Sequence, residues 1–365
     1  MGLYFGIFLV TLGASLAALY CASGIWPLYR LMRTAVIMAG SNLFLVLAVG
    51  LLGSNGWLLL GREALLAGVY GGTAAALALG GIFLLQRPFG IATYPWLLEL
   101  SHPDEPLLRR FREGAPGSYY ASLFVASLAH QATEAVGADA LLARVGALYH
   151  DVGKLRRPAF FAENQPLLRS GNVHDRLSAP LSSLVITSHV RDGVELARQH
   201  KLPPQVADII AEHHGTTLVS YFYHRALTHG AGAQASESQF RYPGPRPRSP
   251  EAAIVMLADS AQAAAQTLAG PSAGALASLV RNLVRDRVED GQLDECDLTV
   301  RQLAVISESL VKMLHAMASP GRVEYPQSLP PKGSARANGR NHSQSAETAP
   351  GPAAAEASPR RRLSA

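Results

Sequence analysis

Charged residues are almost missing from the first 85 positions of this chain of 365 residues. Over the whole sequence only 16% of residues are charged, whereas a soluble domain normally has about a quarter. Nearly all ionisable groups follow Leu85. This shortage argues against an ordinary soluble domain at the N-terminal end and indicates a membrane segment there.

Cysteines are scarce as well. The only two, Cys21 and Cys296, lie far apart in the sequence, which argues against a disulfide framework and suits a reducing compartment. Aromatic residues make up 7% of the chain, and they form no stripe with basic residues. We therefore expect no nucleic-acid polymer as a partner. The net charge of +5 has another explanation, because several arginines follow the last apolar run or lie in the tail, where they suit a cytoplasmic membrane surface.

Three apolar runs are each long enough to span a bilayer, which takes roughly 20 residues: Leu3–Ile25, Ala35–Leu52 and Ala64–Leu85. Arg30 and Arg33 separate the first two runs, and the stretch Gly53–Gly61 between the last two has no charge. By the positive-inside rule, the first loop and everything after the third run are cytoplasmic. We therefore expect a multi-pass protein of the inner or plasma membrane, with the lipid bilayer as a partner.

The remaining chain predicts an all-α fold, because apolar residues recur with a helical period and strand-like alternation is scarce. The clearest helical stretches are Ala121–Val136, Leu141–Leu148, Leu181–Ile186, Val206–Ala211, Ala252–Ala265, Ala275–Val288 and Leu303–Met317. The composition from Ser319 onward is typical of disorder. We expect a membrane domain of about three transmembrane helices (1–87), a cytoplasmic linker (88–115), a helical catalytic domain (116–325) and a disordered tail (326–365).

The strongest chemical signal is the pair His150–Asp151, which follows an apolar helix and precedes Gly153 and Lys154. An adjacent imidazole and carboxylate can supply a nitrogen and a bridging oxygen to a metal pair, and a lysine there can face an anionic substrate. Downstream, further His and Asp residues are predicted to end other apolar helices: His189, His213, His214 and Asp259. A lone His near a helix end is more often a surface or capping residue. The metal hypothesis therefore depends on the ordered set, and a second pair, His174–Asp175, is interpreted as a loop feature.

Longer strings carry a resemblance to a known family. They are Glu113–Tyr119, Glu212–Thr217, Tyr221–His224, Phe240–Pro245 and Asp290–Asp297. Together with the His and Asp set, these strings resemble the membrane-anchored, seven-transmembrane HD phosphodiesterases, which belong to the HD superfamily of metal-dependent phosphohydrolases. The resemblance implies hydrolysis of cyclic di-AMP to the linear dinucleotide at a site with two divalent metal ions, usually iron or manganese.

The resemblance also implies roles for individual residues. Asp151 would bridge the two metals, with His189, His213 and His214 completing one of them and His150 and Asp259 holding the other. Asp151 and Lys154 would be catalytic, and Lys154 would also neutralise the phosphate. Thr217, Tyr223 and Arg241 are candidate nucleotide contacts, and each could equally be a packing or loop residue.

Two departures from the family leave alternatives open. The family has a metal-binding His where this chain has Ala121, in the string Tyr119–Ser122. His130 lies about two and a half helical turns further on, on the opposite face, and is expected at the surface. The metal held by His150 and Asp259 would thus lose a ligand, so the domain could bind a nucleotide without hydrolysing it efficiently.

A different HD phosphohydrolase, acting on another phosphoester, also remains open. The second departure is at the N-terminus, because the family places an extracytoplasmic domain and further spans before these three runs. The chain is therefore interpreted as either truncated or a shorter variant. The sequence leaves a homodimer open.

Overall fold

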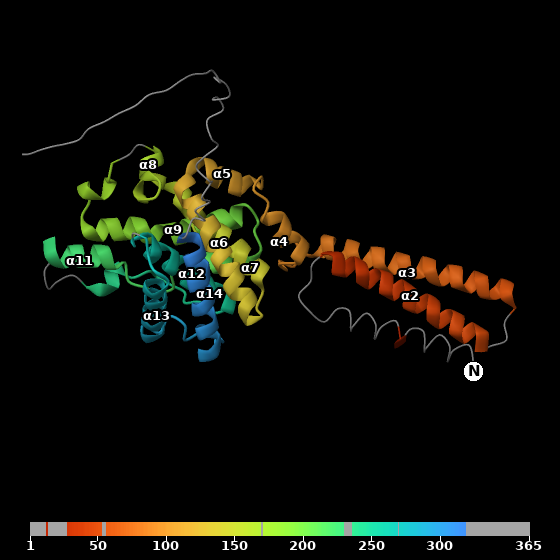
Figure 1. The fold of residues 1–365 in the computed structure, drawn as a ribbon. Helices are drawn as coiled ribbons and strands as arrows, with labels where there is room; N and C mark the ends of the chain where they lie inside the picture. The colour runs from red at the N-terminus through yellow and green to blue at the C-terminus, as the bar shows by residue number, and fades with distance from the viewer. Residues whose placement is uncertain are drawn as a thin grey trace, which may run out of the picture. The chain divides into compact units, whose positions relative to one another are not determined.

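The computed structural model describes residues 12–13, 28–52, 56–168, 171–229, 236–268 and 270–318. Within these ranges the chain is helical and has no strand, apart from one isolated antiparallel bridge between Leu218 and Arg241 (Figure 1). The prediction of an all-α fold is confirmed for this part of the chain. The predicted tail, 326–365, lies outside the described residues.

The elements follow one another in a simple order. The α-helices are α2 (Leu28–Leu52), α3 (Trp57–Leu85), α4 (Tyr94–Leu100), α5 (Pro106–Gly114), α6 (Pro116–Val136), α7 (Ala140–Tyr149), α8 (Gln165–Leu168), α9 (Ala179–Gln199), α10 (Pro204–Glu212), α11 (Ser220–His229), α12 (Pro250–Gln266), α13 (Ala273–Glu289) and α14 (Val300–Ala318). Short 3-10 turns are η1 (Val152–Arg156), η2 (Pro158–Phe160), η3 (Val173–Arg176) and η5 (Glu237–Phe240).

The first two helices, α2 and α3, pack against each other. Among the described residues, α3 alone is long and apolar enough to cross a membrane, and α2 contains a shorter apolar stretch, Ala39–Ala48. The charge-free loop is shorter than expected, since α3 begins at Trp57 and includes Arg62 and Glu63. Nearly all of the first predicted span, Leu3–Ile25, lies outside the described residues. A membrane domain of three spans therefore stays a prediction.

The structure differs from the expected linker at residues 88–115. This stretch forms α4 and α5, and Leu107, Leu108 and Phe111 are fully buried in the main hydrophobic core. Glu105 caps the start of α5 by accepting hydrogen bonds from the backbone amides of Leu107 and Leu108. The Arg-rich sequence suggested a surface segment because the arginines occupy one face of α5 and the apolar side chains the other.

The core lies around α6, which packs against α7, α12 and α14. α12 in turn contacts α7, α10 and α13 (Figure 1). Side-chain caps fix where several of these helices begin: Asp139 caps α7, Ser178 caps α9 and Ser249 caps α12. These contacts hold the end of α7 close to α10, which is followed by His213 and His214, and to α12, which carries Asp259.

The helix-end interpretation is only partly correct. His150 follows the last residue of α7, and His213 and His214 follow the last residue of α10, as expected. His189, however, lies near the middle of α9, and Asp259 lies near the middle of α12. Both helices continue past these residues because their apolar positions recur on the core face, at Leu196 and Ala197 in α9 and at Ala261 in α12.

Candidate metal centre

Three histidines are oriented by the same local device. The ring Nδ1 of His150 contacts the carbonyl oxygen of Ala147 at 2.6 Å, that of His189 the carbonyl of Ile186 at 2.6 Å, and that of His213 the carbonyl of Ile210 at 2.8 Å. A carbonyl oxygen only accepts hydrogen bonds, so each Nδ1 donates its proton. When the ring is neutral, its Nε2 then has a free lone pair, which is the arrangement that metal-binding histidines use.

These Nε2 atoms face the carboxylate of Asp151. Its Oδ1 lies 3.4 Å from Nε2 of His189 and 3.9 Å from Nε2 of His213, whereas its Oδ2 lies 3.2 Å from Nε2 of His150. Asp259 approaches from α12, with Oδ1 3.5 Å from Nε2 of His150 and Oδ2 3.9 Å from Nδ1 of His214. The two oxygens of Asp151 therefore point toward two different sets of partners.

Two groups of residues could each hold a cation. In the first group, Asp151, His189, His213 and His214 offer ligand atoms that all lie within 4.8 Å of one another. The second group, His150, Asp151 and Asp259, meets the same criterion. We call these the three-histidine group and the His150 group. All six metal ligands predicted from the sequence belong to them, and Asp151 belongs to both.

The residues present fit a divalent metal ion. Nε2 of His150 and Oδ1 of Asp151 are buried, and neither has a hydrogen-bond partner among the described residues. Buried polar atoms rarely remain unsatisfied in proteins, and both atoms are lone-pair donors that a cation would satisfy. Imidazole and carboxylate ligands suit several divalent transition metals, so the donor set does not select one of them.

In the cation-free site, the imidazoles of the two ligand groups differ in charge. Burial and the neighbouring histidines lower the pKa of His213 to about 3, and burial also lowers the pKa of His189 and of His214. For His150, burial acts in the same direction, but Asp151 and Asp259 outweigh it and raise the pKa to about 10. At neutral pH the three-histidine group is therefore neutral at its imidazoles, and His150 carries a proton.

Gly153 brings the segment after Asp151 against α9. A Cβ atom at this position would lie 1.9 Å from the carbonyl oxygen of His189 and 2.5 Å from the backbone nitrogen of Gly193. Only a residue without a side chain allows this approach. The backbone contact sets the distance between Asp151 and His189, which come from separate elements.

Lys154 lies beside this carboxylate, and its predicted role of facing an anionic substrate stays a prediction. Its Nζ is 2.8 Å from Oδ2 of Asp151 and 2.8 Å from Oε1 of Glu163. Sequence reasoning missed Glu163, because nothing in the spacing shows that the irregular segment after η1 returns to Lys154. It also missed Tyr242, a buried residue whose ring lies 4.2 Å from that of His214 and 6.1 Å from that of His189.

The three candidate nucleotide contacts all have partners within the protein. The Thr217 hydroxyl donates to the carbonyl of His214 at 2.8 Å, and Tyr223 packs against a small cluster that includes Phe240. The Arg241 guanidinium pairs with Asp290 at 2.9 Å and donates to the carbonyl of Thr216 at 2.8 Å. Their role in binding a substrate stays a prediction.

Other histidines lie elsewhere. Neither ligand group includes Ala121 or any other described residue of α6. His130 is half-buried rather than on the surface, and its Nδ1 donates to the carbonyl of Ala140 at 3.0 Å. His174 is buried in η3 and donates from Nε2 to the carbonyl of Phe160 at 2.8 Å. His130 therefore does not replace a ligand at position 121.

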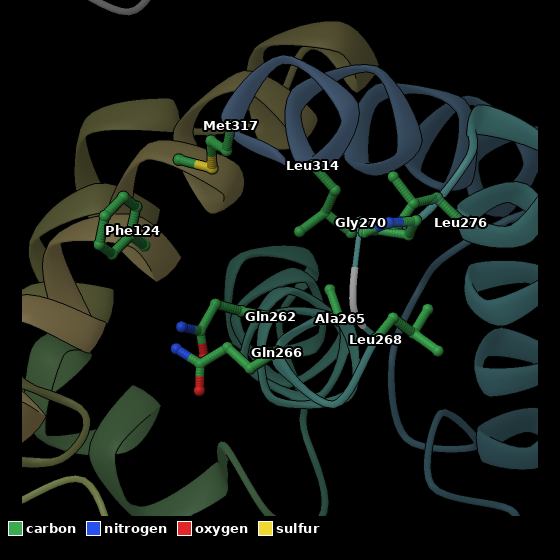
Figure 2. A pocket seen from close by; sticks show the side chains of 10 residues that line it. Phe124, Gln262, Ala265, Gln266, Leu268, Gly270, Leu276, Leu314 and Met317 are labelled. Carbon is green, nitrogen blue, oxygen red and sulfur yellow. The ribbon is translucent and has the colours of Figure 1, made fainter. Parts of the chain in front are cut away.

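A separate apolar groove of about 320 Å³ lies beside α12, with Phe124 on one side and Leu276 and Leu314 on the others (Figure 2). It shares no residue with either ligand group. The two glutamines that line it, Gln262 and Gln266, are one to two helical turns beyond Asp259. The groove is therefore distinct from the candidate metal centre.

Fold and site together define a helical domain with a buried His and Asp cluster that could hold metal. Comparison with known proteins agrees: residues 119–264 match the model of the HD domain. The chain is 41% identical over 300 residues to the cyclic-di-AMP phosphodiesterase PgpH of Bacillus subtilis (strain 168). The aligned region covers 82% of this chain and 42% of that protein. It is 37% identical over 303 residues to the PgpH of Listeria monocytogenes, and that aligned region covers 80% of this chain and 41% of that protein.

A solved structure is similar as well. The crystal structure of the L. monocytogenes PgpH HD domain in complex with cyclic-di-AMP is 37% identical, has a TM-score of 0.56, and covers 60% of this chain and 100% of that one. This chain belongs to the HD-domain family. It spans about two fifths of the length of the two PgpH relatives.

Proposed function

We propose that this chain is a metal-dependent phosphodiesterase that hydrolyses a cyclic dinucleotide, cyclic di-AMP, to the linear dinucleotide. The observation that carries the proposal is that Asp151 belongs to both ligand groups, which is the arrangement a two-cation centre needs. The substrate is supported by the names of the PgpH relatives and by the cyclic-di-AMP complex of the similar HD domain.

The reaction adds water across one phosphodiester bond. A P–O bond to the water oxygen forms, the P–O bond to the ribose oxygen breaks, and that oxygen takes up a proton. When bound, two divalent cations, iron or manganese, would lower the pKa of the attacking water and stabilise charge on the phosphate oxygens. The other contributions come from the protein. The Nδ1–carbonyl hydrogen bonds hold the rings of His150, His189 and His213 in one orientation, and Asp151 and Asp259 supply the carboxylates.

Lys154 is the proposed partner of the scissile phosphate. Its ammonium lies against Asp151, and its side chain is 15% exposed, so a phosphate at the centre can reach it. A groove of about 380 Å³ beside α9 is lined by Ser188, the sequence neighbour of His189, and by Pro243, the sequence neighbour of Tyr242. Like the apolar groove, it includes no residue of either ligand group. Arg157 and Arg191 also line it. The guanidinium of Arg157 pairs with Asp192 at 3.0 Å, and the guanidinium of Arg191 suits a second phosphate. Thr217, Tyr223 and Arg241 remain proposed substrate contacts.

We also propose that the domain is anchored to the inner or plasma membrane by more than one span and faces the cytoplasm. The apolar helix α3 and the loop arginines support this proposal. Protease protection in sealed vesicles tests the topology. Sedimentation of the purified chain tests whether it forms a homodimer.

The direct test of function is to incubate the purified chain with manganese and cyclic di-AMP and to follow the linear product by chromatography. We expect turnover by the wild type and its loss in Asp151→Asn, which keeps the shape of the side chain and removes its charge. A panel of competing nucleotides identifies a different phosphoester substrate. Absence of any linear product at micromolar protein would contradict the hydrolase proposal.

A second candidate function is nucleotide binding without efficient hydrolysis. It is favoured by the smaller ligand set of the His150 group, which has three residues, and by Ala121, whose methyl group cannot bind a metal. If this function is correct, Ala121→His should raise turnover while the affinity for the cyclic dinucleotide stays unchanged. Efficient turnover by the wild type would eliminate this candidate.

A further inference from the structure

The ammonium group of Lys154 is divided between two carboxylates. Its Nζ lies 2.8 Å from Oδ2 of Asp151 and equally 2.8 Å from Oε1 of Glu163. Oδ2 is the oxygen that faces His150, so it is the one that Asp151 would offer to a cation in the His150 group. Lys154 and that cation therefore compete for the same lone pairs.

Glu163 is held in place from outside the metal centre. The hydroxyl of Ser118, at the start of α6, donates to Oε1 of Glu163 at 2.7 Å. Asn164 fixes the same turn, because its Oδ1 accepts from the backbone nitrogen of Ser118 at 3.1 Å and its Nδ2 donates to the Ser118 hydroxyl at 2.8 Å. A Cβ on Gly117 would lie 2.1 Å from the carbonyl oxygen of Glu163, so the two segments touch through their backbones.

Burial makes this second carboxylate important. The side chains of Lys154 and Asp151 are only 15% and 5% exposed, and an ammonium that loses its partner in such surroundings is strongly destabilised. Burial acts to raise the pKa of Glu163, yet the neighbouring ammonium outweighs it and lowers that pKa, so Glu163 is a charged partner at neutral pH. It can thus keep Lys154 paired when Asp151 turns its oxygen to a cation.

We propose that Glu163 is a positioning residue: it retains the ammonium of Lys154 when a divalent cation takes Oδ2 of Asp151, and so allows the His150 group to fill. The proposal rests on the proposed two-cation function. With a neutral residue at 163, Lys154 keeps Asp151 as its one charged partner, and the centre carries one more positive charge. Both effects oppose a cation in the His150 group more than one in the three-histidine group.

The test is manganese titration of the cation-free full chain by calorimetry. We expect two binding events in the wild type, the weaker of them at the His150 group. In Glu163→Gln we expect this weaker event to lose affinity by about tenfold to a hundredfold, the usual range for a residue that supports metal ligands. The stronger event should change by less than about threefold. Glu195→Gln is the matched control, because Glu195 pairs with Arg156 at the surface, and it should leave both events unchanged.

A double-variant cycle separates positioning from a merely structural role. In a Lys154→Met background the competing ammonium is gone, so adding Glu163→Gln should change the weaker event by less than about twofold. An equal loss of affinity in both backgrounds would overturn the proposal. If Glu163→Gln does not fold, as judged by its melting curve, Ser118→Ala serves instead: it keeps the carboxylate, loosens it, and should weaken the same event by a smaller factor.

The outcomes also distinguish this proposal from the function beneath it. A single binding event in the wild type would refute the two-cation function, and the positioning role with it. Two events in the wild type that Glu163→Gln leaves intact would refute the positioning role alone.

Discussion

Replacing Gly153 with alanine perturbs a close backbone approach at the candidate metal centre. The new Cβ would lie 1.9 Å from the carbonyl oxygen of His189, whereas a carbon and an oxygen in contact are normally about 3.3 Å apart or more. The segment after Asp151 and helix α9 would therefore have to separate by on the order of 1.4 Å. Functional ligands must be held within about 0.5 Å of their working geometry, so we expect the ligand set shared by Asp151 and His189 to be disrupted.

The magnitudes follow from the same contact. Overpacking a well-packed interior destabilises a protein by about 1–3 kcal/mol, which lowers the melting temperature of a domain of this size by roughly 2–12 °C. Manganese affinity should fall by about tenfold or more. Both are measured on the purified chain, by thermal unfolding and by calorimetric titration.

The matched control is Gly274→Ala, since a Cβ at Gly274 in α13 would have no atom within 4 Å. It should leave metal affinity unchanged and slightly raise stability, because alanine favours a helix over glycine. A Gly153→Ala chain that melts and binds manganese like the wild type would refute the claim that this contact sets the site.

Three further predictions concern the site. In the cation-free protein His150 has a pKa raised to about 10, so below that pH its proton must leave before a metal binds; the affinity of the His150 group should rise by about tenfold from pH 7 to pH 8. The manganese affinity of the three-histidine group, whose imidazoles have lowered pKa values, should hardly change. Titrations in which both affinities change by the same factor between pH 7 and pH 8 would contradict this assignment. Arg191→Gln should raise the KM for cyclic di-AMP several-fold with little change in kcat if the groove beside α9 holds the second phosphate, and an unchanged KM would exclude that placement. Arg241→Ala should lower the melting temperature as well as the affinity for substrate, since the Arg241 guanidinium joins Asp290 to the carbonyl of Thr216; a change in KM alone would instead mark Arg241 as a direct contact.

The sequence was most informative where one local pattern determines the result. Helical periodicity predicted α6, α7, α12, α13 and α14 to within several residues, because apolar spacing alone specifies which face is buried. The set from His150 to Asp259 was identified by residue type and order, and the structure brings its members together.

The sequence was less informative where the result depends on tertiary contacts. Leu107, Leu108 and Phe111 fall within the stretch 88–115 that was expected to be a linker, and only the packing of α5 shows that its apolar face is buried. The role of Glu163 depends on Ser118, 45 residues away, and on a chain path of 3-10 turns without a periodic signal. The position of His189 within α9 was missed because a polar residue on an otherwise apolar face resembles a helix end. Asp259 was interpreted as a helix end as well, although the predicted helix Ala252–Ala265 extends past it.

The most direct test of the metal centre is the metal content of the chain, measured by mass spectrometry after reconstitution with saturating manganese and removal of the free ion. Because Asp151 belongs to both ligand groups, we predict about two cations per wild-type chain and fewer than about one in Asp151→Asn. A wild-type chain that retains no metal, or an Asp151→Asn chain that retains as much as the wild type, would contradict a shared two-cation centre.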